Sequence, residues 1–207
     1  MFLDALVTGF SSFLVLIVAI GAQNSFMLRQ GLLCQHVLPI ALFFGFCDAL
    51  LLGAGVLGFG ALVRAVPWLP PLMLWFGVLF LIGYGFTRLW AAYRGSSVLV
   101  AGASSRTSLR DVLVLAAIFT WLNPHAYLDT LVIMGALSLS FPSGIAKTAF
   151  LLGATAASLV FFLALGYGAR FLTPFFTSVR AWRILDTGIA LIMFALAAKL
   201  ALSSPSF

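Results

Sequence analysis

Charged side chains are scarce in this chain of 207 residues, where Asp, Glu, Lys and Arg together make up only 8%. Soluble domains carry roughly 25%. Hydrophobic residues make up 63% of the chain, and its mean hydropathy is +1.19. This balance excludes an ordinary water-soluble domain, because too few polar side chains are present to cover its surface. The chain is therefore predicted to fold within a lipid bilayer.

Cysteine and histidine are also rare, with two residues each. Cys34 and Cys47 form no CxxC pair, so membrane redox chemistry is not expected. Only His125 lies within an apolar run, and there is neither HExxH spacing nor a serine-nucleophile motif, which makes a membrane-embedded enzyme the least favoured class. The scarcity of Cys, His and Glu also disfavours a metal-ion exporter. No metal site and no cofactor are predicted.

Apolar runs fill most of the remaining sequence. A helix needs roughly 20 apolar residues to cross the hydrocarbon core of a bilayer. The runs are continuously apolar rather than alternating, which argues against a β-barrel. The sequence therefore predicts an all-α membrane protein with six transmembrane helices, at Leu3–Leu28, Val37–Val63, Leu72–Ala92, Val112–Leu137, Ile145–Gly168 and Ile184–Leu202.

The net charge of +6 does not indicate a nucleic-acid partner, because the basic residues are scattered singly between apolar runs. Their distribution predicts orientation instead, since cytoplasmic loops collect Lys and Arg. The first, third and fifth loops hold eight basic residues, namely Arg29, Arg88, Arg94, Arg106, Arg110, Arg170, Arg180 and Arg183. The opposite side holds three, namely Arg64, Lys147 and Lys199. The central linker is therefore expected in the cytoplasm and both termini outside.

A serine- and glycine-rich segment, Arg94–Ser108, divides the chain. We expect residues 1–93 to form a first three-helix half, residues 94–110 a cytoplasmic linker, and residues 111–207 a second half. Because three crossings are an odd number, the two halves would enter the membrane from opposite faces. Each half has a polar interruption in its first helix, at Gly21–Asn24 and at Asn123–His125. Paired interruptions of this kind indicate a transporter site between inverted repeats.

The interruption in the second half lies in N-P-H-A-Y-L-D-T, residues 123–130. Pro124 cannot donate a backbone hydrogen bond, so it is expected to break the helix. His125 and Asp129 are i, i+4 neighbours, and Asn123 shares another face with Tyr127. A broken helix offers free carbonyls to a cation and free N–H groups to a carboxylate. The pattern suits a zwitterion that also carries a cationic tail.

Asp48 lies about halfway along the second apolar run, where an ionised carboxylate costs several kcal/mol. A substrate site is the favoured interpretation of Asp48, and a fixed ion pair with Arg88 is the structural alternative.

Gln23 and Asn24 follow Gly21, whose flexibility allows a helix break, and their amides offer several donors and acceptors. An ordinary helix end is the alternative for these two residues.

Three other features are expected to be structural. Arg88 is expected to reach the cytoplasmic surface with its long side chain. Asp186 is expected to form an interfacial ion pair with Arg183, of little energetic value. A stripe of small residues in the fifth apolar run is expected to serve helix packing or a homodimer contact, and includes Gly153, Ala154, Ala157 and Ser158.

Over essentially its whole length the chain resembles the LysE/ArgO family of basic amino acid exporters. The resemblance rests on G-A-Q-N with the following R-Q-G in residues 21–31, on Asp48, and on W-L-N-P-H-A-Y-L-D-T in residues 121–130. It implies a six-helix carrier that exports L-lysine or L-arginine across a bacterial inner membrane. Related threonine and homoserine exporters resemble P-G-P where this chain has G-A-Q-N, which favours the cationic branch.

The expected mechanism is exchange of a basic amino acid for protons. Asp48 and Asp129 would alternately hold the cationic side chain of the substrate and protons. The α-amino and α-carboxylate groups would be oriented by Gln23, Asn24, Asn123 and Tyr127, with His125 also in the site. The alternatives are a related exporter of neutral amino acids or of a cation, and a passive channel.

Overall fold

The structure is a computed structural model that describes residues 1–18, 21–57, 69–95, 108–141, 144–176 and 178–202. These residues are almost entirely helical, and none of them lies in a strand. The elements are α1 (Phe2–Ile17), α2 (Ala22–Leu32), α3 (Val37–Val56), α5 (Leu69–Arg94), α7 (Leu109–Trp121), α8 (Pro124–Tyr127), the π-helix η1 (Leu128–Ile133), α9 (Met134–Ser138), α10 (Gly144–Gly168), the 3₁₀-helix η2 (Ala169–Phe176) and α11 (Val179–Leu202). The expected all-α class is confirmed.

Six uninterrupted crossings are not observed. Within the described residues, four helices are long and apolar enough to cross a membrane, at Val37–Val56, Leu74–Arg94, Gly144–Phe176 and Val179–Leu202. A fifth span arises if the bent pair of α1 and α2 is counted as one crossing. The expected run at Val112–Leu137 is divided among α7, α8, η1 and α9. Residues 58–63 of the second expected span, and linker residues 96–107, lie outside the described residues.

The first expected span is not a single straight helix. Helix α1 ends at Ile17, α2 begins at Ala22, and the two axes differ by 82°. Gly21 is the N-cap of α2 and has an extended backbone, with φ −126° and ψ −179°. An interruption within a single hydrophobic stretch leaves backbone groups unpaired, so side chains must satisfy them.

A second interruption separates α7 from α8. Helix α7 ends at Trp121, and α8 begins at Pro124, a residue whose fixed φ suits the first turn of a helix. A π-helix follows directly, and π-helical turns are frequently found at functional sites because they displace side chains from their helical register.

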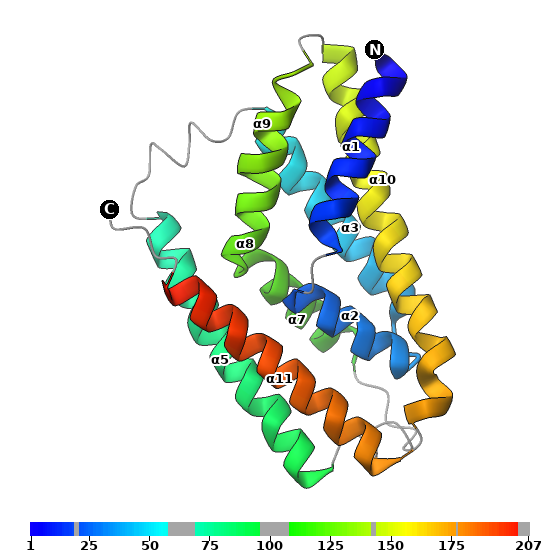
Figure 1. Cartoon of the computed structure of the whole chain (residues 1–207), viewed down its shortest axis with the longest axis vertical. Coiled ribbons are helices and arrows are strands. Elements are labelled where there is room, and N and C mark those ends of the chain that lie inside the picture. The colour runs from blue at the N-terminus through cyan, green and yellow to red at the C-terminus, as the bar shows by residue number, and fades with distance from the viewer. Residues whose placement is uncertain (19–20, 58–68, 96–107, 142–143, 177, 203–207) are drawn as a thin grey trace.

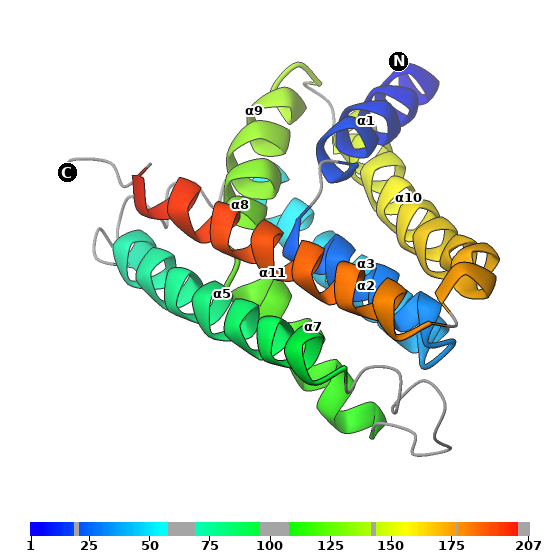
Figure 2. The same cartoon turned by 60° about the horizontal axis from the view of Figure 1, so that its bottom comes forward.

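The helices form two flanks (Figure 1). On one flank α5 and α11 lie side by side and run in opposite directions, as Figure 2 also shows. On the other flank α10 packs against both α1 and α3. The outer faces carry large apolar side chains, such as Phe46, Leu79 and Leu191, which are 61%, 65% and 63% exposed. Such surfaces are stable against lipid rather than water.

Close helix contacts depend on glycine. A Cβ atom at Gly153 of α10 would overlap the backbone of Leu6 in α1, and one at Gly9 of α1 would overlap the backbone of Phe150. Small residues at such crossings let the backbones approach, which is the main route to helix packing in a membrane. The packing role expected for Gly153 is confirmed.

Candidate functional site

The carboxylate of Asp48 is enclosed between α3 and α10. Its residue is 3% exposed, and the hydroxyl of Ser158 donates a hydrogen bond of 2.6 Å to Asp48 Oδ2. Ser158 was expected only to pack, but its side chain is a polar partner of the central acid. A short hydrogen bond to a buried carboxylate lowers the cost of removing it from water. The neighbouring Cys47 is in side-chain contact with Trp121, the last residue of α7.

The first helix break is held by two side-chain amides. Asn24 Nδ2 donates a hydrogen bond of 2.7 Å to the carbonyl oxygen of Ile17, which is the last residue of α1. Gln23 Nε2 donates to Thr120 Oγ1 at 2.9 Å. The first bond satisfies a carbonyl that α1 leaves without a helical partner. The second joins the start of α2 to the end of α7.

The second break has its own side-chain contacts. The Tyr127 hydroxyl donates to the carbonyl oxygen of Trp121 at 2.8 Å and so bridges the end of α7 to α8. Asn123 and Asp129 are half-buried, and both interact with other groups of the protein. The side chains of Pro124 and His125 lie outside the part of the structure that is described.

Helices α2 and α7, which border the two breaks, both pack against α3. Gln23 reaches Thr120, and the Trp121 side chain reaches the residue before Asp48. The π-helix also packs on α3, because a Cβ at Gly55 would overlap the backbone at Thr130. Gly55 lies about 10 Å further along α3 than Asp48, at 1.5 Å per residue. The residues predicted for the site therefore lie on elements that converge on α3.

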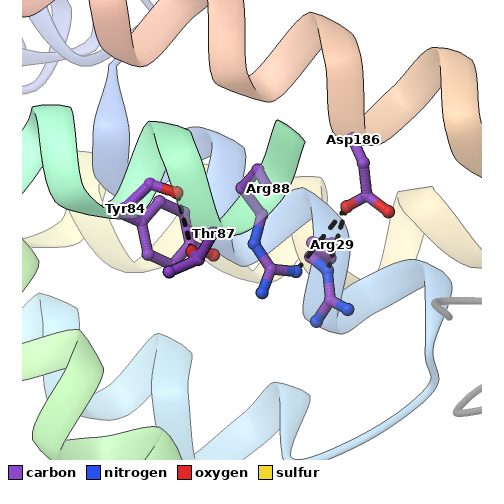
Figure 3. A network of polar contacts seen from close by, with 5 residues as sticks. All are labelled: Arg29, Tyr84, Thr87, Arg88 and Asp186. Atoms are coloured by element: carbon purple, nitrogen blue, oxygen red, sulfur yellow. Dashed lines mark hydrogen bonds and ion pairs between the residues drawn. The ribbon is translucent and has the colours of Figure 1, made fainter. Parts of the chain in front are cut away.

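A second polar cluster connects three helices (Figure 3). Arg29 Nε of α2 lies 3.7 Å from Asp186 Oδ1 of α11, and Arg88 Nη1 of α5 lies 3.6 Å from the same oxygen. The side chains of Arg29, Arg88 and Asp186 are 12%, 18% and 1% exposed. The guanidinium of Arg88 also lies 5.1 Å from the ring centre of Tyr84, within the range of a cation–π contact.

Two expectations about this cluster are wrong. Arg88 does not extend to the surface, because its side chain is drawn inward to a buried carboxylate. Asp186 pairs with Arg88 and Arg29, whereas Arg183 donates to the carbonyl oxygen of Tyr93 at 3.3 Å. The fixed ion pair considered between Asp48 and Arg88 is likewise replaced by the pair of Arg88 with Asp186. Asp186 lies in the N-terminal part of α11 together with Arg180 and Arg183, so its position in the sequence suggests an interfacial charge.

Among the described residues, no group of three or more His, Cys or Asp side chains lies close enough together to hold a metal ion. The side chains of the site offer electrostatic and hydrogen-bonding contacts. Asp48 can hold a cation, the amides and Tyr127 can orient polar groups, and the arginine cluster can hold an anion.

Comparison with known proteins gives consistent matches. A family model described as LysE type translocator matches residues 14–204. The candidate amino-acid transporter Rv0488 of Mycobacterium tuberculosis is 43% identical over 189 residues, covering 91% of this chain and 92% of that protein. The Arginine exporter protein ArgO of Salmonella paratyphi C is 35% identical over 193 residues, covering 93% of this chain and 91% of that protein. No solved structure matches the chain.

Proposed function

Because this chain belongs to the LysE type translocator family, we propose that it is a secondary active exporter of basic L-amino acids, arginine or lysine or both. It works in the bacterial inner membrane and exchanges its substrate for protons. The observation that carries the proposal is the burial of Asp48 within α3, beside two interrupted helices. An acid in that position is costly to maintain and marks a substrate or proton pathway.

The substrate class follows from the charges of the site. A basic amino acid has a cationic side chain, for which Asp48 and Asp129 are the complementary groups. Its α-amino and α-carboxylate groups are polar and fit the amides of Gln23, Asn24 and Asn123 and the Tyr127 hydroxyl. The 35% identical relative is named as an arginine exporter, which supports this choice of substrate.

Export of a cation against the membrane potential needs an energy source, and we assign this role to protons. Moving one positive charge outward against an inside-negative potential costs about 2.3 kcal/mol per 100 mV. A passive pore would therefore let a cationic amino acid leak inward. Asp48 accepts a hydrogen bond from Ser158 and can exchange a substrate cation for a proton at the same carboxylate. Protons that enter from outside would then drive the substrate out.

The orientation proposed from the loops places the central linker in the cytoplasm and both termini outside. The pairing of helices supports two inverted halves, since α5 and α11, the last helices of the two halves, pack on each other. In an inverted repeat, α1 of the first half corresponds to α7–α9 of the second half, and α3 corresponds to α10. The contact of α1 with α10 therefore has its counterpart in the contact of α7–α9 with α3, and both contacts occur. A pseudo-two-fold relation of this kind is typical of secondary transporters.

Counterflow in proteoliposomes tests the function. Vesicles are loaded with unlabelled arginine or lysine, and uptake of labelled arginine, lysine and threonine is followed over a series of pH values. We expect exchange of the basic amino acids that depends on pH, and none of threonine. Flux that needs no substrate on the opposite side would indicate a channel, and exchange of threonine alone would indicate a neutral amino acid exporter.

Asp48→Asn tests the role of the central acid. The substitution keeps the shape of the side chain but removes its charge, so exchange should fall to background with a normal amount of protein in the membrane. Asp111→Asn is a matched control, because Asp111 is exposed in the first turn of α7. Normal exchange by the Asp48→Asn protein would contradict the proposal.

A further inference from the structure

The cluster of Arg29, Arg88 and Asp186 lies apart from the central acid. Arg29 is on the last turn of α2, Arg88 lies within the C-terminal part of α5, and Asp186 lies within the N-terminal part of α11. Figure 3 shows Nε of Arg29 and Nη1 of Arg88 facing the carboxylate of Asp186. Three helices from distant parts of the sequence thus meet at one buried oxygen.

The cluster has an excess of positive charge and unused donors. Two guanidinium groups face one carboxylate, so the net charge of these three side chains is +1. The three side chains are at most 18% exposed. Both contacts exceed the 2.7–3.2 Å range of an N–H···O hydrogen bond. Within the described residues, Arg29 Nε and Arg88 Nε and Nη1 are buried without a hydrogen-bond partner. A buried donor without a partner is unfavourable, so the arrangement is suited to a further anion.

We propose that Arg29 and Arg88 bind the α-carboxylate of the transported amino acid, at a recognition site separate from Asp48, and that Asp186 occupies the two arginines in the absence of substrate. This inference rests on the proposed function as an amino acid exporter, and it differs in one point, because the two arginines rather than the amides near Asp48 hold the α-carboxylate. A bound carboxylate would bring the net charge of the cluster to zero and would provide acceptors for the unused N–H groups.

A carboxylate is the anion that fits best. The guanidinium fork matches the two oxygens of a carboxylate, and such pairs are among the strongest hydrogen-bonded contacts in proteins. The group that already stands between the two arginines, Asp186, is itself a carboxylate. The stacking of Arg88 on Tyr84 holds the guanidinium plane, and the Thr87 hydroxyl donates to the Tyr84 carbonyl oxygen at 2.7 Å, which ties Thr87 to the same turn.

Helix α2 links this site to the central one. Gln23 and Asn24 stand at its start, and Arg29 lies about 9 Å further along, at 1.5 Å per residue. A substrate carboxylate that competes with Asp186 would weaken the contact of α11 with α2 and α5. Recognition of the substrate would thereby loosen the helices that enclose it.

Ligands that differ only in the carboxylate test this assignment. Binding of L-arginine and of agmatine, which is arginine without its carboxylate, is measured by calorimetry on the detergent-purified full-length chain. Arg29→Gln and Arg88→Gln each leave one arginine with Asp186, a neutral pair that is compatible with folding. We expect each to weaken L-arginine binding at least about tenfold, the effect of losing charge-assisted hydrogen bonds, while agmatine binding stays within about twofold.

Two further variants complete the test. Arg88→Lys keeps the charge but loses the fork, so L-arginine binding should be intermediate. Arg94→Gln is the control, because Arg94 is exposed at the end of α5, over the Trp90 ring at 4.7 Å, and should leave both ligands unaffected.

The outcomes distinguish a failure of the carboxylate site from a failure of the proposed function. Suppose that the wild-type chain binds L-arginine. If the Arg29 and Arg88 variants then bind L-arginine and agmatine with equally reduced affinity, or bind both as tightly as the wild type does, the carboxylate site is refuted and the proposed function stands. If the wild-type chain binds neither arginine, lysine nor agmatine, the substrate class is wrong and the inference fails with it.

Discussion

Removal of Asp186 should destabilise the protein more than removal of either arginine that it contacts. The two guanidinium–carboxylate distances are 3.7 and 3.6 Å. At an effective dielectric constant of about 20 each attraction is about 4 kcal/mol before the cost of burial is subtracted. Asp186→Asn leaves two buried cations facing each other, and removing one partner of a buried pair costs about 3–5 kcal/mol. Arg29→Gln leaves a neutral pair and should cost about 2 kcal/mol.

Thermal unfolding in detergent, followed by size-exclusion chromatography with fluorescence detection, measures this difference. A loss of about 4 kcal/mol corresponds to roughly 10 °C in a chain of this size. Asp111→Asn, at the exposed start of α7, should leave the midpoint nearly unchanged. If Arg29→Gln lowers the midpoint as much as Asp186→Asn does, Asp186 is not the shared counter-ion, and the charge argument for the cluster is wrong.

Three further predictions concern the central site and the packing. Ser158→Ala removes the hydrogen bond of 2.6 Å to Asp48 and should cost about 2 kcal/mol of stability; a double-mutant cycle with Asp48→Asn should show coupling above about 0.5 kcal/mol. Gly153→Val forces α10 away from the backbone of Leu6, so the amount of folded protein in the membrane should fall sharply, whereas Gly144→Ala, with open space around it, should not. Gln23→Ala should reduce the exchange rate in proteoliposomes without reducing protein level.

The fold was predictable where hydrophobicity determines it. Apolar runs longer than a bilayer requires must become helices, and α5 and α10 follow the expected ranges closely. Helix α3 ends at Val56, before the expected Val63, and α11 begins at Val179, before the expected Ile184. The interruption at Gly21 was predictable from the glycine and the amides that follow it, but the size of the bend between α1 and α2 was not, because Ala22–Leu32 continues a sequence that is long enough to cross straight. Its 82° angle depends on partners from elsewhere in the chain, such as Thr120, which bonds Gln23.

The central site was easier to anticipate than the arginine cluster. Asp48 and Asn123 stand out because polar side chains are costly inside apolar runs. Arg88 and Asp186 lie close to the ends of their helices, where a charge can reach water at little cost, so the sequence alone suggested surface positions. Their burial results from the packing of α5 on α11 with α2 across them, which is a tertiary feature that no local pattern reveals.

The acids of this chain divide into two groups with different costs. The chain has five acidic residues, and all of them are aspartates. Asp4 and Asp111 are exposed in the first turns of α1 and α7, where the helix dipole favours a negative charge at little cost. The other three, Asp48, Asp129 and Asp186, lie within membrane helices or at a helix break, where each charge must be compensated. Asp186 contributes stability as the counter-ion of two buried arginines. The proposed transport gives a further reason for all three acids: a substrate cation and a proton would take turns at Asp48 and Asp129, and a substrate carboxylate would replace Asp186.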